Sequence, residues 1–194
     1  MNRHYITALL FVLVALVGQA AEFTADAEKY LRSTVDEVLS VADRASDRHT
    51  LADKVRPILL RRVSFDAMTR RAVGPGWRQF TPDQQKKATQ LFATLVIRTY
   101  SNKFTPGEKP VVSYKAALSP ASGRVDVPTG LVYKGSRYSV TYRMEQEGGW
   151  KITDVVIEGV SMIANYRTQL DAQFKKGGAH AVLTSLEQSV SHPS

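Results

Sequence analysis

The chain has 194 residues and a formal net charge of +8. This length is enough for one domain with a hydrophobic core of its own. The absence of cysteine excludes disulfide bonds, a thiol nucleophile and a cysteine metal site. The positive charge allows attraction to anionic lipid or nucleic acid, although scattered surface lysine and arginine side chains explain it equally well.

The first twenty residues are predicted to be a secretory signal peptide. A short basic start precedes a continuous apolar stretch over residues 6–17, and the sequence GQA at 18–20 places small residues where a signal peptidase cuts. Cleavage there leaves residues 21–194 as a single domain with 25 basic and 18 acidic side chains, a formal charge of +7. Export without disulfides fits a Gram-negative periplasm, where we expect a soluble protein.

Helices are predicted over about residues 23–104. Apolar residues recur with a helical period between residues 23 and 41. Thr50 and Asp53 have the spacing of a capping box at the start of a second helix. Pro57 lacks a backbone donor, so it predicts a kink or a fresh start in that helix.

Two further helices have clear end signals. Ser64 is expected to cap a short helix that ends at the sequence GPG, residues 74–76. The sequence TPDQ at 81–84 is the strongest start signal in the chain, because it supplies an N-cap, a proline in the first turn and a capping box. An apolar stripe with helical spacing then continues to Tyr100.

A four-stranded sheet is predicted over about residues 110–158, where the apolar period changes to two. The first strand covers residues 112–118. The second begins at Val125, and Pro128 is expected to disturb it before it resumes at Leu131. Strands this close together in sequence favour an antiparallel meander with helices on one face.

The remaining strands and helices complete an α+β domain. The third strand is RYSVTYRM, residues 137–144, and the fourth lies within GGWKITDVVIEG, residues 148–159. Helices are then expected over about residues 161–191, with a break at Gly177-Gly178. The predicted fold is therefore a curved antiparallel four-stranded sheet packed by helices on one face, with additional N- and C-terminal helices.

The position of Ser161, between a predicted strand and a predicted helix, raises the question of a nucleophile elbow. That motif requires G-x-S-x-G, but Ile163 stands at the last position. We therefore expect Ser161 to be a helix N-cap. The histidines after the signal peptide, His49, His180 and His192, are isolated from one another, so no metal site is predicted.

Carboxylates are the remaining candidates for catalysis. Asp154 interrupts an apolar strand, and it or Asp126 could be the general base of an isomerase or hydratase. The favoured alternative is a sheet carboxylate paired with an arginine. No G-x-x-x-x-G-K-[ST] loop is present, so nucleotide hydrolysis is not expected. Arg61-Arg62 and Arg70-Arg71 lack interleaved aromatic residues, which argues against nucleic-acid binding and leaves them as candidates for a docking surface.

Two long stretches carry a family resemblance. They are SFDAMTRRAVGPGWRQFTPDQQKKATQLFATLVIRTY, residues 64–100, and GWKITDVVIEGVSMIANYRTQL, residues 149–170. A glycine pair and a final amphipathic helix follow. Together they resemble the MlaC (toluene-tolerance) family of periplasmic phospholipid-binding proteins over nearly all of the mature chain. A close relative associated with hopanoid transport shares much of this pattern.

The resemblance implies a fold like that of nuclear-transport-factor-2 domains, with a deep apolar pocket. It implies that the pocket holds the acyl chains of a phospholipid and leaves the headgroup toward solvent. The implied partners are an outer-membrane lipoprotein–porin complex and an inner-membrane ABC transporter with an MCE-domain protein. No cofactor and no enzymatic activity are implied, and we expect a monomer.

The predicted ligand-binding residues are those with inward phase on the sheet and the flanking helices, because the family has no sharp ligand motif to transfer. They are Trp77, Phe92, Val96, Tyr100, Tyr114, Tyr138, Val140, Tyr142, Val156, Met162, Ile163, Tyr166 and Phe174. Trp77 fits a pocket wall and a plain core equally well. Arg167 is expected to hold its helix to the domain, with a headgroup contact as the alternative. A binding module with a filled core also remains open.

Overall fold

A computed structural model describes the backbone of residues 3–191 and the side chains of residues 21–191. Its elements are α1 (Arg3–Ala42), α2 (Arg48–Arg62), α3 (Phe65–Val73), the 3-10 helix η1 (Gly74–Gln79), α4 (Pro82–Ser101), β1 (Val111–Tyr114), β2 (Leu118–Ala121), β3 (Arg124–Tyr133), β4 (Ser136–Gln146), β5 (Trp150–Ile157), β6 (Val160–Ser161) and α5 (Met162–Ser191). The signal-peptide prediction falls on residues 1–20, whose side chains lie outside this description, and it stays a prediction.

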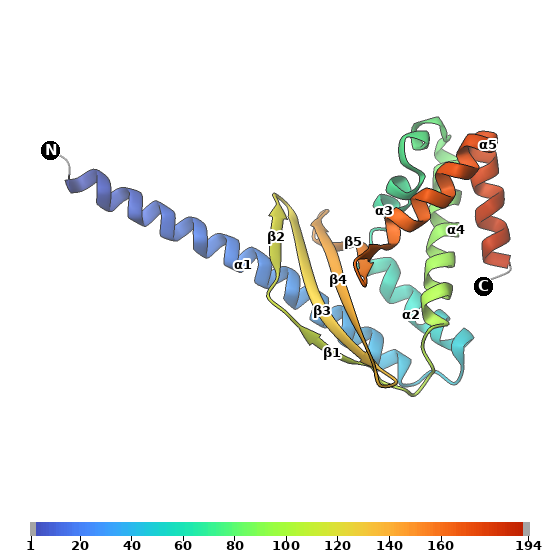
Figure 1. Ribbon diagram of the computed structural model, residues 1–194, viewed down its shortest axis with the longest axis horizontal. Helices are drawn as coiled ribbons and strands as arrows, with labels where there is room; N and C mark the ends of the chain where they lie inside the picture. Colours follow the sequence, from blue (N-terminus) through green and yellow to red (C-terminus); the bar gives the residue numbers. More distant parts are fainter. Residues whose placement is uncertain (1–2, 192–194) are drawn as a thin grey trace.

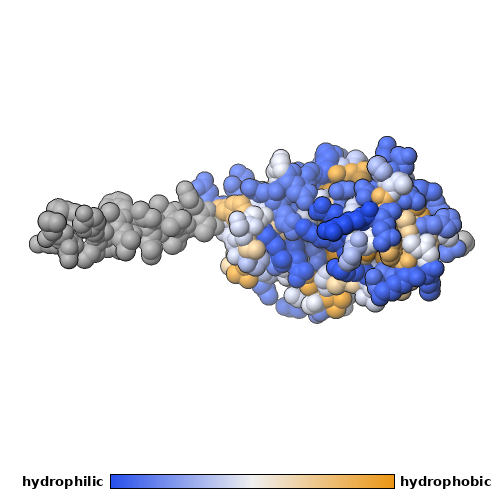
Figure 2. All heavy atoms as spheres, turned by 90° about the horizontal axis from the view of Figure 1, so that it is seen from above, coloured by the Kyte–Doolittle hydropathy of each residue, from blue (hydrophilic) through white to orange (hydrophobic). Residues whose placement is uncertain are grey.

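The protein has two layers, and α1 runs past both of them. Figure 1 shows the sheet on one side of the molecule and helices α2 to α5 gathered on the other. Helix α1 contacts both α2 and β3, so it joins the layers. Within the described residues, no helix is long and apolar enough to cross a membrane. The face in Figure 2 is largely hydrophilic and carries separate hydrophobic patches.

The sheet is open and antiparallel, in the order β1-β3-β4-β5-β6, and β2 also pairs with β3. The α+β class is therefore confirmed, but the count of four strands is wrong. The first predicted strand is divided into β1 and β2, both of which pair with β3. The short β6 pairs with β5 directly before α5. Such a two-residue strand is too short to show an alternating pattern.

Pro128 does not interrupt β3, contrary to expectation. Its carbonyl oxygen accepts a hydrogen bond from the backbone nitrogen of Lys115 (2.9 Å). Nitrogen and oxygen of one strand residue point to the same side, so the proline nitrogen faces the gap between β1 and β2. No strand residue in that gap needs a hydrogen bond from the nitrogen of residue 128. The strand therefore tolerates proline, which has no N–H to donate.

Most helix signals are confirmed in detail. The backbone nitrogen of Thr81 donates to Gln84 Oε1 (2.9 Å), and that of Gln84 donates to Thr81 Oγ1 (3.3 Å), which is the predicted capping box. The break in α5 is also present, because Gly177 and Gly178 have non-helical backbone angles. Gly178 has φ of +60°, a conformation that glycine adopts at little cost.

The start of α2 differs from its prediction. Asp47, and not Thr50, is the N-cap, and its carboxylate accepts from the backbone nitrogen of Thr50 (2.8 Å). Asp and Thr are both good caps, so the spacing alone could not decide between them. The helix also continues through Pro57 without ending there.

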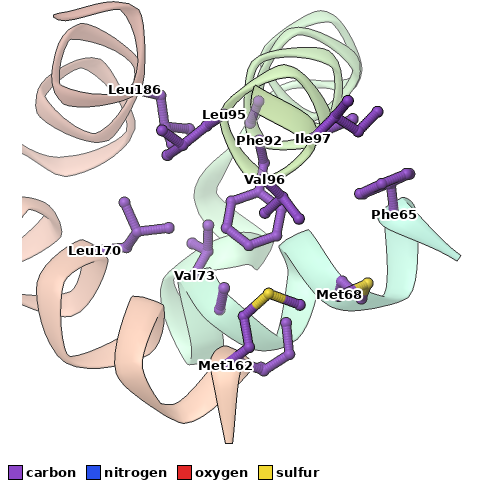
Figure 3. Packing of buried hydrophobic residues seen from close by; sticks show 14 of the residues in the cluster. Phe65, Met68, Val73, Phe92, Leu95, Val96, Ile97, Met162, Leu170 and Leu186 are labelled. Carbon is purple, nitrogen blue, oxygen red and sulfur yellow. The ribbon is translucent and has the colours of Figure 1, made fainter. Parts of the chain in front are cut away.

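The buried residues form two separate hydrophobic clusters. The larger, here called the helical core, joins α2, α3, α4 and α5, and Figure 3 shows ten of its residues labelled, among them Phe92, Met162 and Leu186. The smaller, here called the sheet core, packs Ala27 and Leu31 of α1 against β3, β4 and β5. The separation of these clusters is what leaves space between the layers.

Candidate binding cavity

A cavity of about 290 Å³ lies between the sheet and helices α1, α2 and α4. Its helical wall includes Val38, Leu51, Val55, Val96 and Ile97, and its sheet wall includes Val112, Leu131, Val140, Tyr142, Val155 and Ile157. The volume is near the lower end of the range of about 300–1,000 Å³ that is usual for ligand pockets. Such a predominantly apolar wall suits a hydrocarbon ligand.

The cavity occupies the boundary between the two hydrophobic clusters. Its wall takes Phe65 and Met68 from the helical core, and Leu31 and Ile152 from the sheet core. Side chains of both clusters therefore face the same space without filling it. This arrangement contradicts the alternative of a binding module with a filled core.

A β-bulge decides which residues of β5 face the cavity. Met144 pairs with Ile152 while the preceding residue of β4, Arg143, pairs with Asp154, so Thr153 is an extra residue in the ladder. A single extra residue moves all later side chains to the opposite face. The wall accordingly contains Val155 and Ile157. The prediction that Val156, which lies between them, faces inward is wrong.

Five of the predicted ligand-binding residues lie in the cavity wall. They are Val96, Tyr100, Val140, Tyr142 and Met162. The structure thus brings together residues from α4, β4 and the start of α5. Their contact with a ligand stays a prediction, because geometry alone gives only their position.

Five others belong to the helical core, away from the cavity wall. They are Trp77, Phe92, Ile163, Tyr166 and Phe174. Phe92 and Tyr166 pack edge to face with ring centroids 5.0 Å apart, and Phe174 stacks on Phe80 at 6.3 Å. Their inward phase was read correctly, but they point toward neighbouring helices and not toward the sheet.

The last two predicted residues also lie outside the wall. Tyr114 packs on the sheet core beneath the guanidinium of Arg32, 3.8 Å from the ring centroid. Tyr138 is 39% exposed on β4. Arg167 lies against Gly74, where an added β-carbon would be only 3.3 Å from its guanidinium. That contact ties α5 to the end of α3.

Residues of α1 that were not predicted form part of the wall. Val35, Val38, Leu39 and Ala42 all line the cavity. The signal that could have identified them is the apolar stripe of helical period over residues 23–41. No residue of that stripe is among the predicted ligand-binding residues.

The loop that follows α4 forms part of the cavity wall and is bonded to the β3–β4 turn. Tyr133 OH accepts from the backbone nitrogen of Thr105 (2.7 Å) and donates to Glu108 Oε2 (3.1 Å). Lys134 Nζ donates to Thr105 Oγ1 (2.9 Å) and pairs with Glu108 Oε2 (3.0 Å). The cavity wall includes Phe104, Thr105 and Glu108. These bonds therefore attach this part of the wall to the β3–β4 turn.

Burial changes the acidity of two tyrosines in the wall. Loss of hydration raises the pKa of Tyr142 to about 12. The pKa of Tyr100 is also raised, first by burial and then by the neighbouring Tyr166 and Asp154. Both hydroxyls are therefore neutral at ordinary pH. They can act as hydrogen-bond donors but not as bases.

Asp154 is held by a network on the face of β5 away from the cavity. It pairs with Arg143 (Oδ2 to Nη1, 3.0 Å) and accepts from Ser161 Oγ (2.6 Å) and the backbone nitrogen of Ile163 (3.2 Å). Ser161 Oγ in turn accepts from the backbone nitrogen of Ala164 (3.0 Å), which confirms the N-cap. The favoured pairing with arginine is confirmed as well.

Asp126, the other candidate base, is paired in the same way. Arg124 Nε lies 3.0 Å from Asp126 Oδ1, and Arg143 Nε lies 3.9 Å from Oδ2. Asp126, Arg143 and Asp154 are matched across three strands on the face opposite Val127 and Tyr142. A general base in the cavity is therefore not available from either carboxylate.

Three arginines suggested for docking instead make intramolecular ion pairs. Arg61 and Arg62 of α2 both pair with Glu37 of α1, the second at 3.1 Å. Arg71 of α3 pairs with Glu145 of β4 at 2.6 Å. These pairs join helix to helix and helix to sheet, so the three side chains do not form a free basic patch.

Comparison with known proteins gives a match to a family model and to seven chains of solved structures. The family model of the MlaC protein matches residues 32–188. A solved phospholipid-binding protein from Ralstonia solanacearum, in complex with a phospholipid, has a TM-score of 0.78 and 26% sequence identity. The alignment covers 86% of this chain and 97% of that chain. No curated protein matches the sequence.

Proposed function

Because the chain belongs to the MlaC family, we propose that it is a periplasmic phospholipid carrier whose cavity encloses acyl chains. The observation that supports this best is the cavity itself, whose wall is predominantly apolar and is built from both hydrophobic clusters. A solved protein with the same fold is a phospholipid-binding protein in complex with its ligand.

The energetics of such a carrier follow from the hydrophobic effect. Each methylene removed from water contributes about 0.8 kcal/mol, so about ten enclosed methylenes contribute about 8 kcal/mol. A wall that resembles the bilayer interior lets the chain leave water without trapping it permanently. Few polar contacts are needed, and the wall offers few.

The proposal includes a route as well as a ligand. The carrier is exported by its N-terminal signal peptide and acts as a monomer. It exchanges lipid with an outer-membrane lipoprotein–porin complex and with an inner-membrane ABC transporter that has an MCE-domain protein. Nucleotide hydrolysis by that transporter supplies the energy, and the carrier itself needs no cofactor and catalyses no reaction.

Lipid extraction tests the proposal directly. The mature protein is exported to a bacterial periplasm, purified without detergent and extracted with organic solvent for mass spectrometry. We expect phospholipid in stoichiometric amount, and the same protein refolded from denaturant serves as the lipid-free control. Repeated preparations with no bound lipid would overturn the proposal. Hopanoid in the extract from a hopanoid-producing host would assign a different cargo to the same cavity.

A further inference from the structure

Three hydroxyl groups of the cavity wall have no hydrogen-bond partner in the part of the chain that the structure describes. Six polar or charged residues line the cavity: Thr34, Tyr100, Ser101, Thr105, Glu108 and Tyr142. Thr34 donates to the backbone oxygen of Tyr30 (2.8 Å), and Thr105 and Glu108 are engaged by Tyr133 and Lys134. Among the described residues, none donates to or accepts from the side-chain hydroxyls of Tyr100, Ser101 or Tyr142.

These three hydroxyls also border open space. The only side-chain nitrogen or oxygen atoms in the described residues that are both sealed and unpartnered are Thr89 Oγ1 and Arg143 Nε. The hydroxyls of Tyr100, Ser101 and Tyr142 are therefore accessible, although Ser101 is only 7% exposed. All three residues belong to the cavity wall.

The charge of the wall indicates what kind of group they bind. Within residues 21–191, no lysine or arginine lines the cavity, and the one charged residue that does, Glu108, is already paired with Lys134. A phosphate would require cationic partners, whereas a neutral hydroxyl suits a neutral acceptor. Burial keeps Tyr100 and Tyr142 protonated, so both remain donors.

We propose that Tyr100, Ser101 and Tyr142 bind the ester carbonyl oxygens that join the acyl chains of the lipid to its glycerol. This inference rests on the proposed function and adds the chemical group that is recognised. Ester carbonyls are the polar atoms nearest to the chains, and they accept hydrogen bonds without carrying charge. A buried hydroxyl left unpaired is unfavourable, so the wall discriminates against a lipid that lacks such acceptors.

A pair of lipids that differ only at this linkage tests the inference. Delipidated protein is titrated with diacyl phosphatidylethanolamine and with its dialkyl ether analogue, which has the same headgroup and chain length but no carbonyl. Displacement of a fluorescent fatty acid reports binding. We expect the diacyl lipid to bind about fivefold more tightly for each hydrogen bond of ordinary net strength.

Conservative variants then show which hydroxyl groups cause the preference for the diacyl lipid. Tyr142→Phe, Tyr100→Phe and Ser101→Ala should each reduce the preference for the diacyl lipid, because each weakens diacyl binding and removes the penalty that an unpaired hydroxyl imposes on ether binding. Tyr166→Phe is the matched control, since Tyr166 lies in the helical core outside the wall. Equal binding of the two lipids by the wild-type protein, or a preference that survives all three substitutions, overturns the inference and leaves the proposed function standing. Failure of both lipids to bind overturns both.

Discussion

Replacing Val140 with tryptophan should obstruct the cavity without unfolding the protein. Val140 is buried in the sheet wall, where its side chain faces the cavity. Tryptophan adds roughly seven non-hydrogen atoms, the bulk of about as many methylenes. If about three ligand methylenes are forced back into water at about 0.8 kcal/mol each, binding weakens about 60-fold. In a filled core the same change would instead destabilise the fold by about 1–3 kcal/mol.

The assay combines lipid extraction with thermal unfolding of the same sample. Ser139→Trp is the matched control, because Ser139 precedes Val140 on β4, is exposed, and points away from the cavity. We expect Val140→Trp to lose its lipid and the control to keep it, with both variants folded. A folded Val140→Trp protein with full lipid occupancy would refute the assignment of this space to the ligand.

Three further substitutions test the framework around the cavity. Asp154→Asn should lower the free energy of unfolding by about 2 kcal/mol in urea titrations, because Arg143 loses the nearer of its two carboxylates. The folded variant should still bind lipid. Thr81→Ala should lower the free energy of unfolding by about 1 kcal/mol in the same measurement. An unchanged free energy of unfolding would contradict the capping role. The hydrogen bond from Arg71 lowers the pKa of Glu145, so that contribution to stability is present above the ordinary glutamate pKa of about 4.3 and is lost as pH falls through the lower folded pKa. Arg71→Met should therefore flatten the acid limb of the stability profile, and an unchanged limb would exclude the pair as its source.

Helix positions were predictable because their signals are local. The capping box at the start of α4 and the glycine break in α5 each depend on residues within one turn of the backbone. The α+β order follows similarly from a change of apolar period. Cap choice at α2 was wrong because Asp47 and Thr50 compete for the same role within three residues.

The cavity wall was only partly predictable because it depends on non-local register. The phase of β5 reverses at Thr153, and no residue type in that segment announces a bulge, so Val156 was chosen in place of its neighbours. The aromatic residues of α4 and α5 show a second limit. Periodicity says that Phe92 and Tyr166 face inward, but it does not say which of two hydrophobic clusters they join.

The free-energy cost of an apolar cavity of this size has to be offset by packing elsewhere in the fold. At about 24 cal/mol per Å³, an empty closed cavity of 290 Å³ would cost at most about 7 kcal/mol, which is comparable with the whole stability of a typical domain. The helical core explains how the protein tolerates this cost. Its large aromatic residues, including Phe92 and Trp77, pack between helices and do not depend on the space beside the sheet. The cavity can therefore empty and refill while the packing that holds the helices together persists, which is the property that a carrier requires.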